Sequence, residues 1–166
     1  MKKIKDMRIF VVEDEKMYSR LIESSLKRNG FGDVRTFASG EECIENLDET
    51  PDIVLLDYRL GELNGIDVLK EIRKKVPGTR VIFLSGEETL GIIINAMKLG
   101  ASDFILKNDE AVTKMTKTIR NILLRDLMSF NKKIYKRVAL VSFCIMFVAI
   151  IILLIYSNMY PDVFNR

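Results

Sequence analysis

A chain of 166 residues with a formal net charge of only +3 has room for one ordinary domain and a short appendage. The charge is unevenly spread: residues 108–166 hold nine basic and four acidic side chains, so residues 1–107 carry −2 and show no sign of binding nucleic acid. The absence of histidine and the presence of only two cysteines exclude a disulfide framework and a zinc site, and the first ten residues lack the apolar core of a signal peptide.

Apolar runs alternate with helical patterns along the chain. Strands are predicted at 8–13, 33–38, 52–57, 80–85 and 103–107, and helices at 16–30, 39–48, 65–75, 89–100 and from about 109. This alternation predicts an α/β fold, a (βα)5 doubly wound five-stranded parallel sheet with helices on both faces. Four apolar residues of the first helix fall on one helical face: Met17, Leu21, Ile22 and Leu26.

Chemically active side chains stand where four of the predicted strands end. Glu13 and Asp14 end the first strand, Asp57 the third, Ser85 the fourth and Lys107 the fifth. Taken singly, each is explained by a helix start, a turn or a solvated lysine. In a parallel sheet, however, these ends meet at one edge, which is where ligands bind. Crowded carboxylates repel one another and need a cation, and three oxygen donors without histidine or cysteine suit Mg²⁺.

Five motifs in order resemble the receiver domain of two-component response regulators, over residues 7 to about 124. They are the sequence VVEDE at 11–15, Asp57 after an apolar strand, Gly65 eight positions later, FLSG at 83–86 and KLGASDFILK at 98–107. The resemblance implies a flavodoxin-like fold. It also implies a sensor histidine kinase or phosphotransfer protein as partner, and a phosphoacceptor that assists its own phosphoryl transfer and dephosphorylation rather than an enzyme.

The resemblance assigns roles to individual residues. Asp57 would be the phosphoacceptor, forming an aspartyl phosphate. Mg²⁺ would be held by Asp14, by Asp57 and by the backbone carbonyl of Arg59, with Glu13 reaching it through water.

The remaining roles concern the phosphoryl oxygens and the switch. Lys107 and the hydroxyl of Ser85 would bind the phosphoryl oxygens, and Phe104 would be the aromatic switch that turns inward when Ser85 moves.

The sequence departs from the family pattern at two positions. Leu60-Gly61 stands where Met-Pro is common, so the loop after Asp57 is expected to be more flexible. Asn108 follows Lys107, where the family usually has a proline joined through a cis peptide. A non-proline cis bond costs roughly 3–4 kcal/mol, so both isomers stay open and the reach of Lys107 is in question.

The carboxyl-terminal part predicts a membrane anchor. Residues 138–156 are nineteen residues without a charge, and a helix of that length is about 28 Å long, close to the thickness of a bilayer core. The domains predicted are therefore a receiver at 1–124, a basic juxtamembrane helix or linker at 125–137, a transmembrane helix at 138–156 and a short extracytoplasmic tail at 157–166. The basic residues before the span place the receiver on the cytoplasmic side of the cell membrane, single-pass, with membrane lipid as a partner.

The function predicted is a membrane-anchored stand-alone response regulator that signals by protein contact. Too few residues follow the receiver for a DNA-binding output domain. The alternatives are a non-phosphorylated receiver-like scaffold, a phosphate sink and an aspartyl-phosphate phosphatase of the haloacid-dehalogenase type. The last needs an acid two residues after the nucleophile, where this chain has Arg59.

The oligomeric state also stays open. An apolar stripe predicts either a homodimer seam at 123–134 on one continuous helix, or a first part that packs on the sheet and then a solvated linker; its members are Ile119, Leu123, Leu127, Phe130, Ile134 and Val138.

Overall fold

The computed structural model describes residues 4–86 and 90–159, with the backbone alone at 126–134, 136–137, 153–154 and 156–159. Five parallel strands form one sheet in the order β2-β1-β3-β6-β7. This confirms the predicted five-stranded parallel sheet, and every strand bound lies within one residue of the prediction. The strands are β1 (Arg8–Val12), β2 (Asp33–Phe37), β3 (Ile53–Asp57), β6 (Arg80–Ser85) and β7 (Asp103–Leu106).

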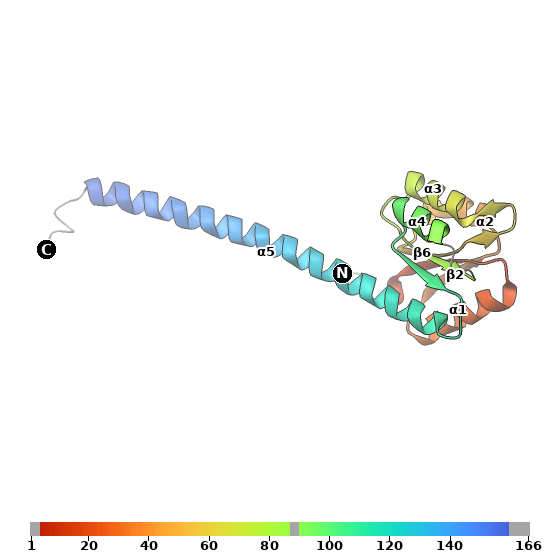
Figure 1. Cartoon of the computed structure of the whole chain (residues 1–166). Coiled ribbons are helices and arrows are strands. Elements are labelled where there is room, and N and C mark those ends of the chain that lie inside the picture. Colours follow the sequence, from red (N-terminus) through yellow and green to blue (C-terminus); the bar gives the residue numbers. More distant parts are fainter. Residues whose placement is uncertain (1–3, 87–89, 160–166) are drawn as a thin grey trace. The chain divides into compact units, whose positions relative to one another are not determined.

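Helices cover both faces of this sheet, with α2, α3 and α4 on one face and α1 on the other (Figure 1). The strand order runs outward in both directions from β1 and β3, so the topological switch point lies between their carboxyl ends. The helices are α1 (Lys16–Arg28), α2 (Gly40–Glu45), α3 (Gly65–Lys75), α4 (Leu90–Lys98) and α5 (Ala111–Met159), with 3₁₀ turns η1 (Ile4–Asp6) and η2 (Leu47–Glu49).

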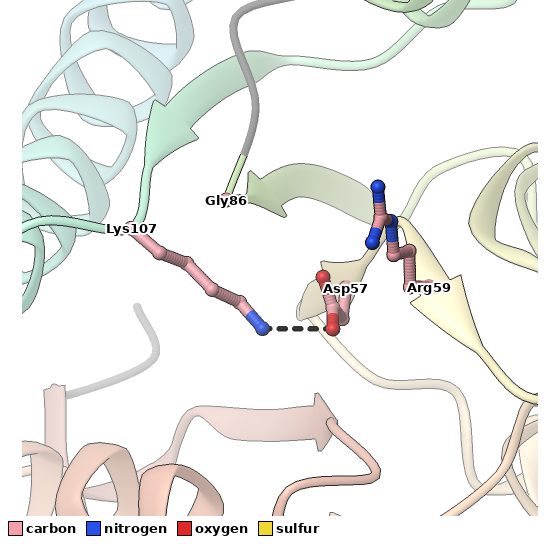
Figure 2. A pocket seen from close by; sticks show the side chains of 4 residues that line it. All are labelled: Asp57, Arg59, Gly86 and Lys107. Atoms are coloured by element: carbon pink, nitrogen blue, oxygen red, sulfur yellow. Dashed lines mark hydrogen bonds and ion pairs between the residues drawn. The ribbon is translucent and has the colours of Figure 1, made fainter.

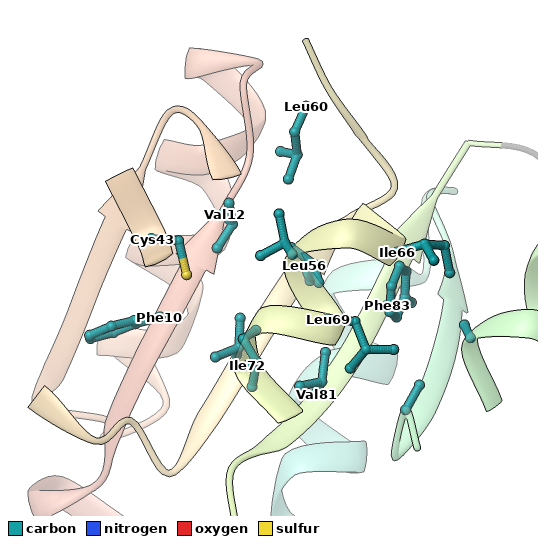
Figure 3. Packing of buried hydrophobic residues seen from close by; sticks show 14 of the residues in the cluster. Phe10, Val12, Cys43, Leu56, Leu60, Ile66, Leu69, Ile72, Val81 and Phe83 are labelled. Atoms are coloured by element: carbon teal, nitrogen blue, oxygen red, sulfur yellow. The ribbon is translucent and has the colours of Figure 1, made fainter. Parts of the chain in front are cut away.

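The core follows from the apolar runs of the central strands. All five residues of β3 are buried, because helices cover the sheet on both sides. On the α2–α3 face, Leu56 and Phe83 pack against Leu69 and Ile72 of α3 (Figure 3). Each such side chain contributes about 1.5–3 kcal/mol through burial, so this layer fixes the strand ends on which the functional residues stand.

The buried face of α1 differs from the predicted one. Ile22 and Leu26 are buried as expected, but Met17 is 81% and Leu21 46% exposed. At 100° per residue, Met17 and Leu21 lie more than a quarter turn from Ile22, whereas Tyr18 lies on the inward side. The buried face of α1 also includes Ser19 and Ser25, so it is rotated relative to the face that the apolar pattern indicated.

The loop after Asp57 is a small hairpin that the sequence did not predict. β4 (Arg59–Leu60) pairs antiparallel with β5 (Leu63–Asn64). Gly61 has φ +77°, the left-handed conformation that a two-residue hairpin turn requires and that glycine adopts without strain. The departure from Met-Pro thus gives a paired segment rather than a loop without regular structure.

The last helix, α5, belongs to two compact units, Met1–Arg120 and Asn121–Arg166. Ile119 is fully buried, as the stripe predicts, but the side chains at 127, 130 and 134 lie outside the described residues. No helix within the described ranges combines the length and the apolar character of a membrane span. The predicted span at 138–156 lies partly, and the predicted tail at 157–166 wholly, outside the described side chains, so both stay predictions together with the predicted domain bounds.

Candidate functional site

Three site residues are fixed by backbone hydrogen bonds that extend the parallel pairing beyond the strands. Glu13 N donates to Phe37 O at 3.0 Å, and Lys107 N donates to Ser85 O at 2.7 Å. Next to Asp57, the last residue of β3, the amide of Tyr58 donates to the carbonyl of Leu84 at 3.0 Å. The predicted site residues therefore leave the sheet from one edge with their backbones held in place.

Lys107 joins two buried acids. Its Nζ donates to Asp57 Oδ2 at 2.7 Å (Figure 2) and to Glu13 Oε1 at 2.9 Å. Glu13 is only 2% and Asp57 4% exposed. Because burying unpaired carboxylates is very costly, the ammonium between them is what allows both acids to lie in the interior.

Burial and hydrogen bonding shift the pKa values of Glu13 and Lys107. Loss of solvent raises the pKa of Glu13 to about 7; the hydrogen bond from Lys107 opposes this rise, and the charge of Asp57 adds to it. Burial acts to lower the pKa of Lys107, but the hydrogen bonds to Asp57 and Glu13 outweigh that effect and raise it. Near pH 7 Lys107 is therefore charged, whereas Glu13 is protonated in only part of the molecules.

Lys107 reaches the acids although no proline follows it. No peptide bond among the described residues is cis, so the Lys107–Asn108 bond is trans. Asn108 instead forms a turn that leads into α5: its Oδ1 accepts from Glu110 N at 3.1 Å, and its carbonyl accepts from Ala111 N at 2.9 Å. An asparagine turn of this kind replaces a backbone partner at a helix start. The open question about cis and trans is settled, and the lysine is not displaced.

Gly65 allows α3 to begin directly behind Asp57. A Cβ at position 65 would clash with the backbone oxygen of Asp57 and lie 2.9 Å from the Phe83 ring. The amide of Gly65 donates to Tyr58 O at 2.8 Å, and the side chain of Asn64 caps the helix. This close approach explains why a glycine stands eight residues after Asp57.

Ser85 and Phe104 lie on the two strands that follow β3 in the sheet. Ser85, at the end of β6, is 3% exposed. Phe104, on β7, is partly buried and packs against the core cluster. The roles that the resemblance gives them as switch residues stay predictions.

The site has space and donors for a hydrated divalent cation. A pocket of about 280 Å³ is lined by Asp57, Arg59, Gly86 and Lys107 (Figure 2). One carboxylate oxygen from each of Glu13, Asp14 and Asp57 lies within 4.8 Å of the others. Glu13 Oε2 is buried and forms an ion pair with Lys107 Nζ at 2.7 Å. A set of hard oxygen donors fits Mg²⁺.

A family model described as the response regulator receiver domain matches residues 9–120. The chain belongs to the response regulator receiver family. A chemotaxis protein CheY from Listeria monocytogenes is 33% identical over 106 residues, which are 63% of this chain and 89% of that protein.

Two solved structures show the same likeness. A response regulator receiver domain protein from Clostridium thermocellum is 30% identical with a TM-score of 0.67, covering 74% of this chain and 98% of that one. The BeF3-activated DrrB receiver domain is 25% identical with a TM-score of 0.64, covering 70% of this chain and 97% of that one.

Two side chains of this receiver take part in the site without having been predicted from the sequence. The ring of Tyr18 lies 4.9 Å from Lys107 Nζ, and the side chain of Arg59 lines the pocket on the other side of Asp57 from the lysine (Figure 2). For Arg59 the resemblance implied a role of the backbone carbonyl alone. A signal for Tyr18 existed, since it lies four residues after Asp14 at the start of a helix and on that helix's inward side.

Proposed function

We propose that this receiver is a membrane-anchored stand-alone response regulator that accepts a phosphoryl group on Asp57 from a sensor histidine kinase or phosphotransfer protein. The observation that carries the proposal is the meeting of Lys107 Nζ with Asp57 Oδ2 at 2.7 Å, beside three converging carboxylates. A nucleophilic carboxylate next to a lysine and an oxygen-donor cation site is what phosphoryl transfer to aspartate requires.

In the proposed reaction, a carboxylate oxygen of Asp57 attacks the phosphorus of a phosphohistidine. The new O–P bond forms as the P–N bond breaks, and the bonding pair leaves on the imidazole nitrogen, which takes up a proton. Lys107 already contacts Asp57 and is placed to move to an equatorial phosphoryl oxygen, where negative charge gathers.

Mg²⁺ would be held by Asp14, by Asp57 and by the backbone carbonyl of Arg59, with Glu13 reaching it through water. When bound, it would offset the charge of the phosphoryl oxygens. A purely catalytic role as a haloacid-dehalogenase-type phosphatase is disfavoured because Arg59, rather than an acid, lines the pocket two residues after Asp57. The protein is thus proposed to be a phosphoacceptor and not an enzyme with a separate substrate.

The membrane part of the proposal rests on the apolar run. Its described side chains are exposed around the helix; for example, Phe143 is 61%, Ile145 65% and Ile152 59% exposed. A helix that is apolar on every side needs an apolar environment such as lipid. Four basic residues lie at 132–137, just before the run, which favours a cytoplasmic receiver and anchors the helix end at anionic headgroups.

Phosphorylation is tested with the full-length chain in mild detergent, Mg²⁺ and acetyl phosphate, followed by intact-mass spectrometry. The chain should gain one phosphoryl group, and Asp57→Asn should abolish the gain. Asp67→Asn is the control, because Asp67 is a half-buried aspartate of α3 whose carboxylate pairs with Lys70 rather than with Lys107. If the wild-type chain stays unmodified by acetyl phosphate and by candidate kinases, the non-phosphorylated scaffold replaces this proposal.

Membrane anchoring is tested separately from phosphorylation. The full-length chain should stay in the membrane fraction after alkaline carbonate extraction, and a tag placed after Arg166 should be accessible only from the outer side. Release into the supernatant would contradict the anchor without affecting the phosphoacceptor.

A further inference from the structure

We infer that Tyr18 is a positioning residue for phosphoryl transfer, holding the ammonium of Lys107 against the face of its ring. This inference rests on the proposed function, since it concerns how the lysine is kept available for the phosphoryl group. The ring centroid lies 4.9 Å from Lys107 Nζ, within the range of a cation–π interaction.

A metal ion would not compete with Lys107 for its contact with the Tyr18 ring. The other contacts of Lys107 Nζ among the described residues are both carboxylate oxygens of Glu13 and one of Asp57. Both acids belong to the carboxylate cluster that suits a divalent cation. When a cation draws on these oxygens, the lysine loses part of its hold on them, but it keeps its contact with the ring.

The fold places Tyr18 for this role. It stands in the first turn of α1, on the same side of the helix as the buried Ile22 and Leu26. The neighbouring Met17 is 81% exposed and points away from the site. Burial raises the pKa of the Tyr18 hydroxyl above its usual value, so the ring is neutral at physiological pH and can face a cation.

The hydroxyl of Tyr18 itself has no part in this contact. Its oxygen is buried and has no hydrogen-bond partner among the described atoms. Removing an unsatisfied buried hydroxyl costs little or nothing, whereas removing the ring removes the contact. Removing the hydroxyl alone should therefore leave the contact with Lys107 intact, whereas removing the ring should abolish it.

Four variants of the full-length chain in mild detergent test the inference: Tyr18→Phe, Tyr18→Leu, Lys107→Ala and the double variant Tyr18→Leu/Lys107→Ala. The rate of phosphorylation by acetyl phosphate is followed at saturating Mg²⁺ by quenched intact-mass measurements. Tyr18→Phe should match the wild type, and Tyr18→Leu should be about two- to tenfold slower. In the Lys107→Ala background, Tyr18→Leu should have no further effect. Met17→Ala is the control for a change in α1 that does not touch the lysine.

A second measurement does not need phosphorylation. Lysines of the unphosphorylated chain are labelled with limiting acetic anhydride, and the label at Lys107 is compared with that at other lysines by peptide mapping. Lys107 should be labelled more in Tyr18→Leu and unchanged in Tyr18→Phe, because the ring shields its ammonium.

The outcomes separate this inference from the proposed function. Increased labelling at Lys107 in a chain that cannot be phosphorylated would support the contact and reject the proposed function. A wild-type rate and wild-type labelling in Tyr18→Leu would overturn the inference while Asp57 remains the acceptor. Equal slowing by Tyr18→Leu with and without Lys107 would also overturn it, since Tyr18 would then act through something other than the lysine.

Discussion

The buried carboxyl of Glu13 makes the stability of the metal-free receiver depend on pH in an unusual direction. Burial raises its pKa from the ordinary 4.5 to about 7. Between these values the folded chain keeps a proton that the unfolded chain releases. Stability from this group is therefore fully present below pH 4.5 and is lost as the pH rises through 7.

The size of the effect follows from the two pKa values. One pKa unit corresponds to about 1.36 kcal/mol, so a carboxyl shifted from 4.5 to about 7 should lower the unfolding free energy by about 2.5 kcal/mol between pH 5 and pH 8. The chain has no histidine, the side chain whose ordinary pKa lies in the middle of this range. Lys107, whose pKa is raised, contributes only at much higher pH.

The assay is urea unfolding of the fragment 1–124, which contains the compact unit Met1–Arg120, in EDTA at pH 5 to 8. The unfolding free energy of the wild type should fall across this range, and that of Glu13→Gln should stay nearly constant. Glu45→Gln, at an exposed position of α2, should keep the wild-type dependence. Parallel pH profiles for the wild type and Glu13→Gln would refute the reasoning, because the proton would then be bound elsewhere.

Three further predictions concern the structure around the site. Gly65→Ala should destabilise the receiver and slow phosphorylation of Asp57, because the added Cβ meets the Asp57 backbone and the Phe83 ring; urea unfolding and the acetyl phosphate assay measure the two effects. Ile72→Ala should cost about 2–5 kcal/mol in urea unfolding and leave the site chemistry intact, since Ile72 is fully buried in the α3 layer. Asn108→Pro should not speed phosphorylation, because Lys107 already reaches both acids with a trans Lys107–Asn108 bond. A faster reaction would show that Lys107 is not well placed in the wild type.

The sheet and its site edge could be predicted from the sequence because both follow from local patterns. Strands buried on both faces appear as continuous apolar runs, and the residues that end them share one edge whatever the packing details. Asp57 and Lys107 were therefore expected together, and the structure brings them into contact. Which of their neighbours touch them depends on helix rotation, and an apolar count does not fix that rotation.

The rotation of α1 shows this limit. Met17 and Leu21 match a helical apolar pattern, yet they face solvent, and Tyr18 turns toward Lys107 instead. The turn after Lys107 shows a second limit. A missing proline suggested a misplaced lysine, but the side chain of Asn108 forms a turn that leads into α5. This local turn depends on backbone geometry that the sequence pattern does not show.

Charge balance links the proton on Glu13 to the contacts of Lys107. Glu13, Asp14 and Asp57 bring three carboxyl groups to one point, and Lys107 lies between two of them. In the metal-free chain a raised pKa at Glu13 removes part of the remaining negative charge by retaining a proton. A divalent cation would replace that proton, so Mg²⁺ binding should release protons near pH 7 and weaken as the pH falls below it.

Replacement of the Glu13 proton by a cation would also weaken the hydrogen bonds from Lys107 to the carboxylates. This would happen at the step in which Lys107 has to bind a phosphoryl oxygen. A lysine freed from its acids could swing toward solvent, because its side chain has many rotamers. Its contact with the ring of Tyr18 would oppose that movement. Mg²⁺ titrations by calorimetry in two buffers of different ionisation enthalpy would measure the protons released at pH 7. Glu13→Gln should abolish that release. An unchanged release would show that the proton comes from another group, and that the contacts of Lys107 do not depend on the protonation of Glu13.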